Sequence, residues 1–273
     1  MASTRTSTGF CRERFACLIK VGGSLDHGQH LLCLCRTIAR LARHHRLLII
    51  PGGAAFADVV RYYYLHYGLN EKSAHHMALF AMDQYGRLLG NLIPGSITVS
   101  DLVAARQAAE SGRPPVLLPA QLVVHADPLP HSWQVTSDTI AAWLAAKAEA
   151  QRLILVKDVD GLFSIDSLGA SAPHLLKEMT VAELAEQVWG AQLRFSRIES
   201  SGSGLPQIAD SKVAEWFRPY RESGFRPSIV DPHLPLLLSR MRLEVWIING
   251  CHPERLEELL ETGQTVGTRI SPR

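Results

Sequence analysis

The chain has 273 residues, 47% of them hydrophobic and 20% charged, a balance that suits one compact globular domain with a sizeable core. Its net charge of +2, from 28 basic and 26 acidic side chains, predicts neither a nucleic-acid partner nor a membrane partner. Five cysteines without a CxxC pair indicate reduced thiols in a cytoplasmic protein. No apolar run approaches the ~18 residues of a membrane span. Residues 1–14 lack the apolar core of a signal peptide and are predicted to be a flexible tail.

The first half of the chain alternates short apolar runs with segments of helical periodicity. Strands are predicted at 15–21, 47–50, 97–99 and 116–119. Helices are predicted between them at 28–44, 54–67, 71–90 and 101–111. This order favours a mainly parallel sheet with helices on both faces.

The second half continues the alternation with one interruption. Strands are predicted at 153–157 and 244–249, and helices at 137–149, 180–188 and 252–261. Thr180 and Glu183 have the spacing of a capping box at the start of the helix 180–188. Residues 190–228, rich in Ser, Gly and Arg, are interpreted as an insertion with a short amphipathic helix near 210–217. Its role is either a surface or oligomer contact or a lid over a ligand.

Glycines and charged side chains follow most of the predicted strands. The carboxyl ends of parallel strands meet at one edge of a sheet, where ligands bind. The residues that we expect at this edge are Lys20, Gly22, Gly23 and Ser24; Gly52 and Gly53; Lys157, Asp158, Asp160 and Gly161; and Asn249 and Gly250. Thr136, Ser137 and Asp138, at the start of a predicted helix, are expected to join them.

These residue types suit the binding of phosphate groups. Glycines let backbone N–H groups approach an anion, and the start of a helix adds positive potential. A lysine supplies a compact cation, and aspartates hold lysines or Mg²⁺. Lys20, followed by Gly-Gly-Ser, is the strongest candidate, although a lysine at a strand end can simply extend to solvent. The sequence has no GxxxxGK[ST], GxGxxG or HExxH motif, which argues against a P-loop, a dinucleotide site and a zinc protease.

Five stretches in order resemble one known family. They are KVGGSL (20–25), IIPGGAAFADVVR (49–61), TSDTIAAWLA (136–145), LVKDVDGLF (155–163) and INGCHPERL with GQTVGTRI (248–270). Together they resemble the amino acid kinase family. The resemblance implies a three-layer αβα sandwich around a mostly parallel sheet of about eight strands. It also implies an acceptor-binding lobe at 15–130 and an ATP-binding lobe at 131–273.

The resemblance assigns roles to individual residues. It implies that Lys20 and Asp138 are catalytic, Lys20 contacting the transferred phosphoryl group and Asp138 organising the lysine. The implied ATP-binding residues are Gly22, Gly23, Ser24, Lys157, Asp158, Asp160, Gly161 and Phe163. The implied acceptor-binding residues are Gly52, Gly53, Arg61, His75, His76, Asp83, Gln84, Thr136 and Ser137. Mg²⁺ is expected to accompany ATP, no metal ligand is assigned, and a homo-oligomer is expected.

Three further stretches resemble one branch of the family. HHMALFAMDQYGRLLGN (75–91), HSWQVTSDTIA (131–141) and IVDPHLPLLL (229–238) are similar to kinases that phosphorylate a furan phosphate in methanofuran biosynthesis. The implied reaction converts a phosphomonoester into a diphosphate. Many members carry a second lysine in a Gly-Met-x-x-Lys stretch, but the matching region reads GFRPSIVDPHLP, and neither Lys212 nor Arg226 fits that motif.

Two alternatives stay open at this point. One is a non-catalytic ATP-binding protein resembling the molybdenum storage protein, which shares the fold. The other is a kinase of a different acceptor, such as a carboxylate or isopentenyl phosphate.

Overall fold

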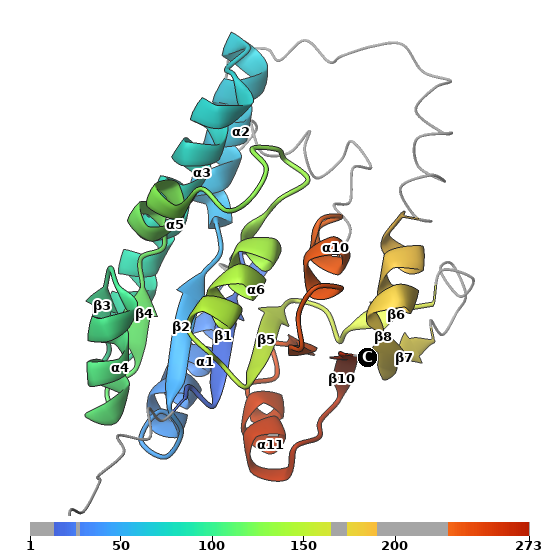
Figure 1. The fold of residues 1–273 in the computed structure, drawn as a ribbon. Coiled ribbons are helices and arrows are strands. Elements are labelled where there is room, and N and C mark those ends of the chain that lie inside the picture. The colour runs from blue at the N-terminus through green and yellow to red at the C-terminus, as the bar shows by residue number, and fades with distance from the viewer. Residues whose placement is uncertain (1–13, 26–27, 165–173, 190–228, 273) are drawn as a thin grey trace, which may run out of the picture.

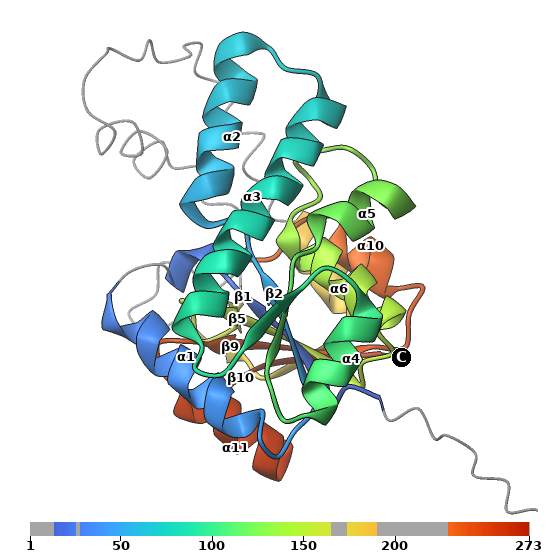
Figure 2. The ribbon, with the colours of Figure 1, turned by 90° about the vertical axis from the view of Figure 1, so that its left-hand side faces the viewer.

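A computed structural model describes residues 14–25, 28–164, 174–189 and 229–272. The predicted insertion at 190–228, with its short helix, lies outside the described residues, as do Lys212, Arg226 and nearly all of the predicted tail. The described residues form a three-layer αβα sandwich, which confirms the predicted fold class (Figures 1 and 2).

The central sheet has eight strands within the described residues, in the order β3-β4-β2-β1-β5-β9-β10-β8. Their bounds are β1 Cys17–Val21, β2 Leu47–Pro51, β3 Ile97–Val99, β4 Pro115–Leu117, β5 Arg152–Lys157, β8 Glu178–Thr180, β9 Glu244–Asn249 and β10 Gly267–Ser271. Every neighbouring pair is parallel except β9 and β10. A separate antiparallel pair joins β6 (Leu162–Phe163) to β7 (Leu175–Leu176).

The central strands are buried on both faces, as expected of parallel strands that read as unbroken apolar runs. Alternate residues face opposite helix layers. In β1, Ile19 packs with the layer of α1 (Gln29–Leu41) and α11 (Glu254–Thr262), and Leu18 packs with the layer of α6 (Ser137–Lys147). Lys20, two residues after Leu18, therefore lies on the α6 side of the sheet.

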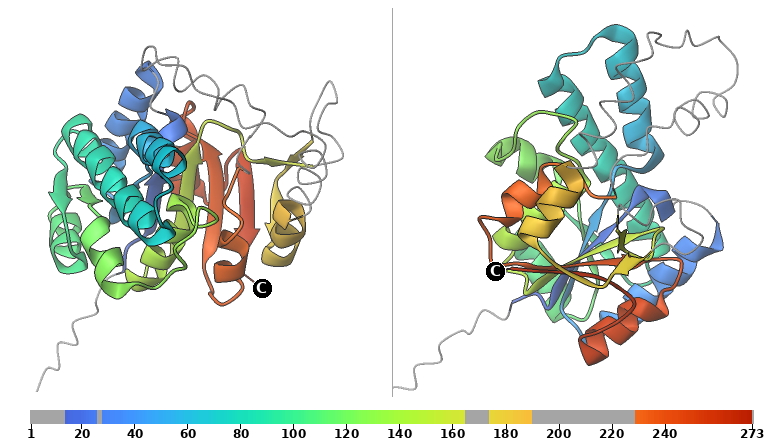
Figure 3. Two further views of the ribbon diagram at one scale, coloured as in Figure 1. Left: turned by 90° about the horizontal axis from the view of Figure 1, so that it is seen from above. Right: turned by 90° about the vertical axis from the view of Figure 1, so that its right-hand side faces the viewer.

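Helices cover both faces of the sheet (Figure 3). The α6 layer also holds α4 (Leu102–Glu110), α5 (Ala120–Ala126), α10 (Leu234–Leu238) and the helical residues 181–189. The long helix α3 (Glu71–Leu92) is capped by Asn70, whose side chain accepts a hydrogen bond from the Ser73 N–H at 2.8 Å. It pairs with α2 (Ala54–Tyr67), and the two helices project beyond the carboxyl ends of the strands (Figure 1).

Most predicted elements are present within a few residues of their expected bounds. The capping box is confirmed, because the Glu183 N–H bonds the Thr180 hydroxyl and the Glu183 carboxylate accepts the Thr180 N–H. The short elements α5, α10, β6, β7, β8 and β10 were not predicted. Each has seven residues or fewer.

Candidate active site

Two lysines share one buried carboxylate at the carboxyl ends of β1 and β5. The Lys20 Nζ lies 2.8 Å from Asp138 Oδ1, and the Lys157 Nζ lies 2.8 Å from Asp138 Oδ2. The two strands are parallel neighbours, and Asp138 belongs to the first turn of α6, which packs over them. Side-chain exposure is only 5% for Lys20, 13% for Lys157 and 4% for Asp138. The fold therefore brings together three charged side chains from three separate elements.

Burial and pairing oppose each other in this cluster. Burial raises the pKa of Asp138, but the Lys157 and Lys20 ammonium groups outweigh it and hold that pKa at about 2. Burial lowers the pKa of Lys20, and Asp138 works against this effect. With all three side chains ionised, the cluster carries one positive charge, which suits it to a phosphate group.

Asp231 is a buried carboxylate that the sequence did not predict as a site residue. It accepts hydrogen bonds from the N–H and hydroxyl of Thr136, the N–H and hydroxyl of Thr139, and the N–H of Leu234. Burial raises its pKa, as does the nearby Asp138. Asp231 thus joins the start of α10 to the first turn of α6. Its only sequence signal is an Asp-Pro pair, which suggests a turn and nothing more.

The glycine turns after β1 and β2 pack against each other and against Lys20. The Gly22 N–H donates to the Val156 carbonyl at 2.9 Å, and the Gly52 N–H donates to the Val21 carbonyl at 2.9 Å. A Cβ on Gly52 would lie 3.5 Å from Lys20 Cε, and one on Gly23 would lie 2.4 Å from the Ala54 backbone. The N–H groups of Gly22 and Gly52 are therefore occupied by the protein itself.

The predicted nucleotide residues cluster at the turn after β5. Asp160 accepts hydrogen bonds from Asn249 at 2.8 Å and Arg255 at 2.6 Å, and these two bonds lower its pKa. Gly161 has a φ of +143°, and a Cβ there would lie 2.5 Å from the Thr268 hydroxyl, so a side chain is excluded. Arg255 was not anticipated, because nothing in the sequence of α11 distinguishes it from a surface arginine.

The remaining residues that were predicted to bind the nucleotide are Phe163, Ser24 and Asp158. Phe163 lies in β6, where its carbonyl accepts a hydrogen bond from the Gln187 side chain at 2.7 Å. Ser24 lies in the short 3₁₀ turn Gly23–Leu25. Asp158 is exposed and makes no hydrogen bond or ion pair with the described residues.

The predicted acceptor residues divide into two groups. Thr136 caps α6, and Ser137 is its first residue, so both lie beside Asp138, while Gly53 precedes α2 next to Gly52. Arg61 and Asp83 are engaged elsewhere. The Arg61 guanidinium bonds Asp58 at 3.0 Å and lies 4.6 Å from the Trp133 ring centroid. Asp83 accepts the Ala120 N–H at 3.0 Å and so fixes the start of α5, and Gln84 is exposed.

His75 and His76 pack against His131 in the loop after α5. The ring centroids of His75 and His131 are 5.0 Å apart, those of His76 and His131 are 5.6 Å apart, and His131 bonds Asp127 at 2.7 Å. A Cβ on Gly86, eleven positions after His75 in α3, would lie 3.1 Å from Pro51 at the sheet edge. At 1.5 Å per residue, His75 is about 16 Å further along the helix. The imidazoles thus join the projecting hairpin to the 127–136 loop.

We expect the contact between these histidines to weaken in acid. The pKa of His75 is lowered from 6.5 to about 4, mainly by burial and also by His131 and His76, while Asp127 opposes them. A histidine whose pKa is depressed on folding contributes stability above pH 6.5 that is lost as the pH falls toward 4. In urea titrations, His75→Gln should lose less stability than the wild type between these pH values. The exposed His125→Gln serves as control, and equal losses in all three proteins would contradict the expectation.

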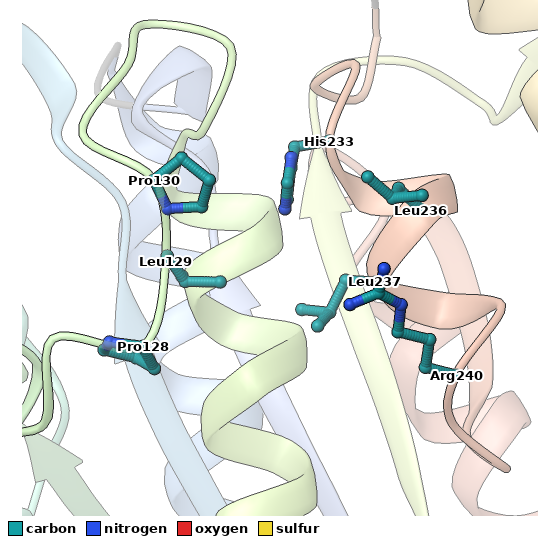
Figure 4. Close-up of a pocket in the computed structure, with 7 residues that line it drawn as sticks. All are labelled: Pro128, Leu129, Pro130, His233, Leu236, Leu237 and Arg240. Atoms are coloured by element: carbon teal, nitrogen blue, oxygen red, sulfur yellow. The ribbon is translucent and has the colours of Figure 1, made fainter.

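A shallow groove of about 300 Å³ separates the loop at 128–130 from α10 (Figure 4). It is lined by Pro128, Leu129, Pro130, His233, Leu236, Leu237 and Arg240. None of the predicted site residues lies in it. The groove lies between this loop and α10, and neither the lysines nor Asp138 line it.

A three-layer αβα fold with paired lysines at the carboxyl ends of its parallel strands is suited to phosphate chemistry. Residues 16–202 match the model of the amino acid kinase family. The chain belongs to this family and is a kinase.

Named relatives support the assignment at low identity. The chain is 24% identical over 255 residues to a [5-(aminomethyl)furan-3-yl]methyl phosphate kinase of Methanocaldococcus jannaschii, covering 93% of this chain and 96% of the relative. It is 23% identical over 270 residues to a uridylate kinase of Methanococcoides burtonii, covering 94% and 97%. The crystal structure of uridylate kinase from Archaeoglobus fulgidus has the same fold, with a TM-score of 0.64 at 18% identity, covering 94% of this chain and all of that one.

The described residues contain neither a candidate membrane span nor a candidate metal site. No helix there is long and apolar enough to span a bilayer. In the same part of the chain, no group of three His, Cys, Asp or Glu side chains is arranged to hold a metal ion.

Proposed function

We propose that the protein transfers the γ-phosphoryl group of ATP to a small phosphomonoester, and that the acceptor is a furan phosphate of the methanofuran type used in one-carbon cofactor biosynthesis. The observation that carries the proposal is the pairing of Lys20 and Lys157 with Asp138 at the edge where β1 and β5 end. Two ammonium groups that share one carboxylate are suited to a phosphoryl group that passes between two anionic substrates.

Catalysis in this scheme is positioning and electrostatic stabilisation, without a covalent intermediate. Lys20 and Lys157 would contact the transferred group and offset its charge. Asp138 is not a general base, since its pKa is about 2 and both of its oxygens are held by lysines. No base is required, because a phosphomonoester has a second pKa near ~6 and is already ionised at neutral pH.

The nucleotide would lie in the C-terminal lobe and the acceptor in the N-terminal lobe. The N–H groups of Gly23 and Gly53 bond none of the described residues and could donate to phosphate oxygens, whereas those of Gly22 and Gly52 are already bonded. Mg²⁺ bound to ATP would neutralise part of the triphosphate charge. Asp158, exposed and unpaired among the described residues, is the carboxylate at this edge that is free to meet it.

The acceptor class is supported by the relatives. Two of them are named for phosphomonoester substrates, a furanylmethyl phosphate and uridylate, and both align over more than nine tenths of this chain. The furan phosphate is preferred because the stretches at 75–91 and 131–141, beside the acceptor region, resemble that branch. A homo-oligomer and a cytoplasmic location stay predictions.

A panel of acceptors tests this proposal. ADP release is measured with MgATP and a furanylmethyl phosphate, uridylate, isopentenyl phosphate or an N-acyl amino acid, and ³¹P NMR identifies the product. A diphosphate formed fastest from the furan phosphate supports the proposal. Preference for another phosphomonoester overturns the furan assignment, and an acyl phosphate product overturns the acceptor class. Purified protein that carries molybdenum or tungsten and uses no acceptor would favour the storage alternative.

A further inference from the structure

Asp231 joins two helices, α6 and α10, near the lysine centre. Its Oδ2 accepts the Thr136 N–H at 3.0 Å, the Thr136 hydroxyl at 2.8 Å and the Thr139 N–H at 3.0 Å. Its Oδ1 accepts the Thr139 hydroxyl and the Leu234 N–H at 2.9 Å. The residue is 4% exposed. Five donors fill both oxygens, so this carboxylate has no free lone pair for a substrate or metal.

Two of the residues that donate hydrogen bonds to Asp231 stand on either side of Asp138 in the sequence. Thr136 and Thr139 flank it in the first turn of α6, and their N–H groups are among those that a helix start leaves unsatisfied. Asp231, more than ninety residues away in the sequence, satisfies them and so fixes the turn that carries Asp138. The Leu234 N–H ties the same carboxylate to the start of α10.

We propose that Asp231 is a positioning residue for phosphoryl transfer, which holds the first turn of α6 so that Asp138 can bridge Lys20 and Lys157, and which places a second buried carboxylate beside this centre. This inference rests on the proposed function for its kinetic consequences. The geometry of the junction and the charge on Lys20 can be measured without any activity.

Three charged groups from the surrounding elements influence the Lys20 ammonium. Asp138 comes from α6, Lys157 from β5, and Asp231 from the segment before α10. Burial lowers the pKa of Lys20, Asp138 raises it, Lys157 lowers it and Asp231 raises it. Removing the charge of Asp231 should therefore lower the pKa of Lys20 further.

Two kinds of substitution separate the charge from the hydrogen bonds. Asp231→Asn keeps the shape but removes the charge, and an amide cannot accept all five donors. Thr139→Val removes one hydroxyl donor and keeps the charge, and Thr139→Ser restores the hydroxyl. The direct readout is the pH titration of the Lys20 ammonium by NMR of ¹⁵N-lysine protein. With six lysines in the sequence, the Lys20 signal is assigned by its loss in Lys20→Arg.

In Asp231→Asn, the midpoint of the Lys20 titration should move to lower pH. The basic limb of the plot of kcat against pH should move in the same direction. In Thr139→Val, the Lys20 titration should stay in place while kcat falls about tenfold at nearly constant KM for ATP, because Asp138 is less well held. Thr139→Ser should recover most of that loss. A residue that served stability alone would lower the melting temperature without moving the Lys20 titration.

The two variants test the two roles of Asp231 separately. An unmoved Lys20 titration in folded Asp231→Asn overturns the electrostatic role, and an unchanged kcat in Thr139→Val overturns the positioning role. Should Asp231→Asn not fold, the Thr139 pair still tests the positioning. If no acceptor is ever phosphorylated but the Lys20 titration moves as expected, the proposed reaction fails while the electrostatic link between Asp231 and Lys20 stands.

Discussion

Lys20→Ala is expected to reduce kcat by at least ~10³-fold and to leave the chain folded. The loss follows because a fixed charge aimed at the developing transition state contributes several kcal/mol, and no other described cation replaces the ammonium on Asp138 Oδ1. The fold survives because Lys157 still bonds Oδ2, so the buried carboxylate keeps a counter-ion. The measurement is steady-state ADP release with the best acceptor, together with the melting temperature by circular dichroism.

The matched control is Lys177→Ala, which removes the same charge from an exposed position next to β8. This variant should retain wild-type kcat and stability, as surface substitutions usually do. Turnover by Lys20→Ala at the rate of Lys177→Ala would remove Lys20 from the mechanism.

The strand-end residues could be predicted because their cause is local. A lysine followed by Gly-Gly, and a strand that runs into Lys-Asp, each contain the break in hydrophobicity that marks the edge of a parallel sheet. The sequence placed Lys157 with the nucleotide. The structure adds its bond to Asp138, which depends on the parallel pairing of β1 with β5 and on how α6 packs over both.

Asp231 and Arg255 could not be predicted, because their roles depend on contacts across the fold. Asp231 bonds residues more than ninety positions away, and Arg255 bonds Asp160 across a similar separation. Neither carries a local period or motif that announces a site. The acceptor role of His75 stays a prediction that rests on the resemblance of its stretch. The length of α3 places His75 about 16 Å past Gly86, which packs at the sheet edge.

Asp138→Asn is expected to be the most damaging single substitution at the site, since it affects stability and catalysis together. A neutral amide would leave the Lys20 and Lys157 ammonium groups, 5% and 13% exposed, without their shared counter-charge. Removing one partner of a buried ion pair typically costs about 3–5 kcal/mol of unfolding free energy. We also expect kcat to fall at least ~10³-fold, because both lysines lose the group that orients them. Urea denaturation and ADP release measure the two effects.

The pH dependence of stability and a double variant show whether loss of the shared carboxylate causes the instability of Asp138→Asn. The pKa of Asp138 is depressed to about 2 in the fold, so its stabilising charge is present above pH ~4 and lost as the pH falls toward 2. The stability gap between wild type and Asp138→Asn should therefore narrow over that range. Adding Lys157→Met removes one uncompensated cation, and should restore part of the stability at pH 7 but none of the activity. A double variant less stable than Asp138→Asn alone would mean that the two lysines do not depend on this carboxylate.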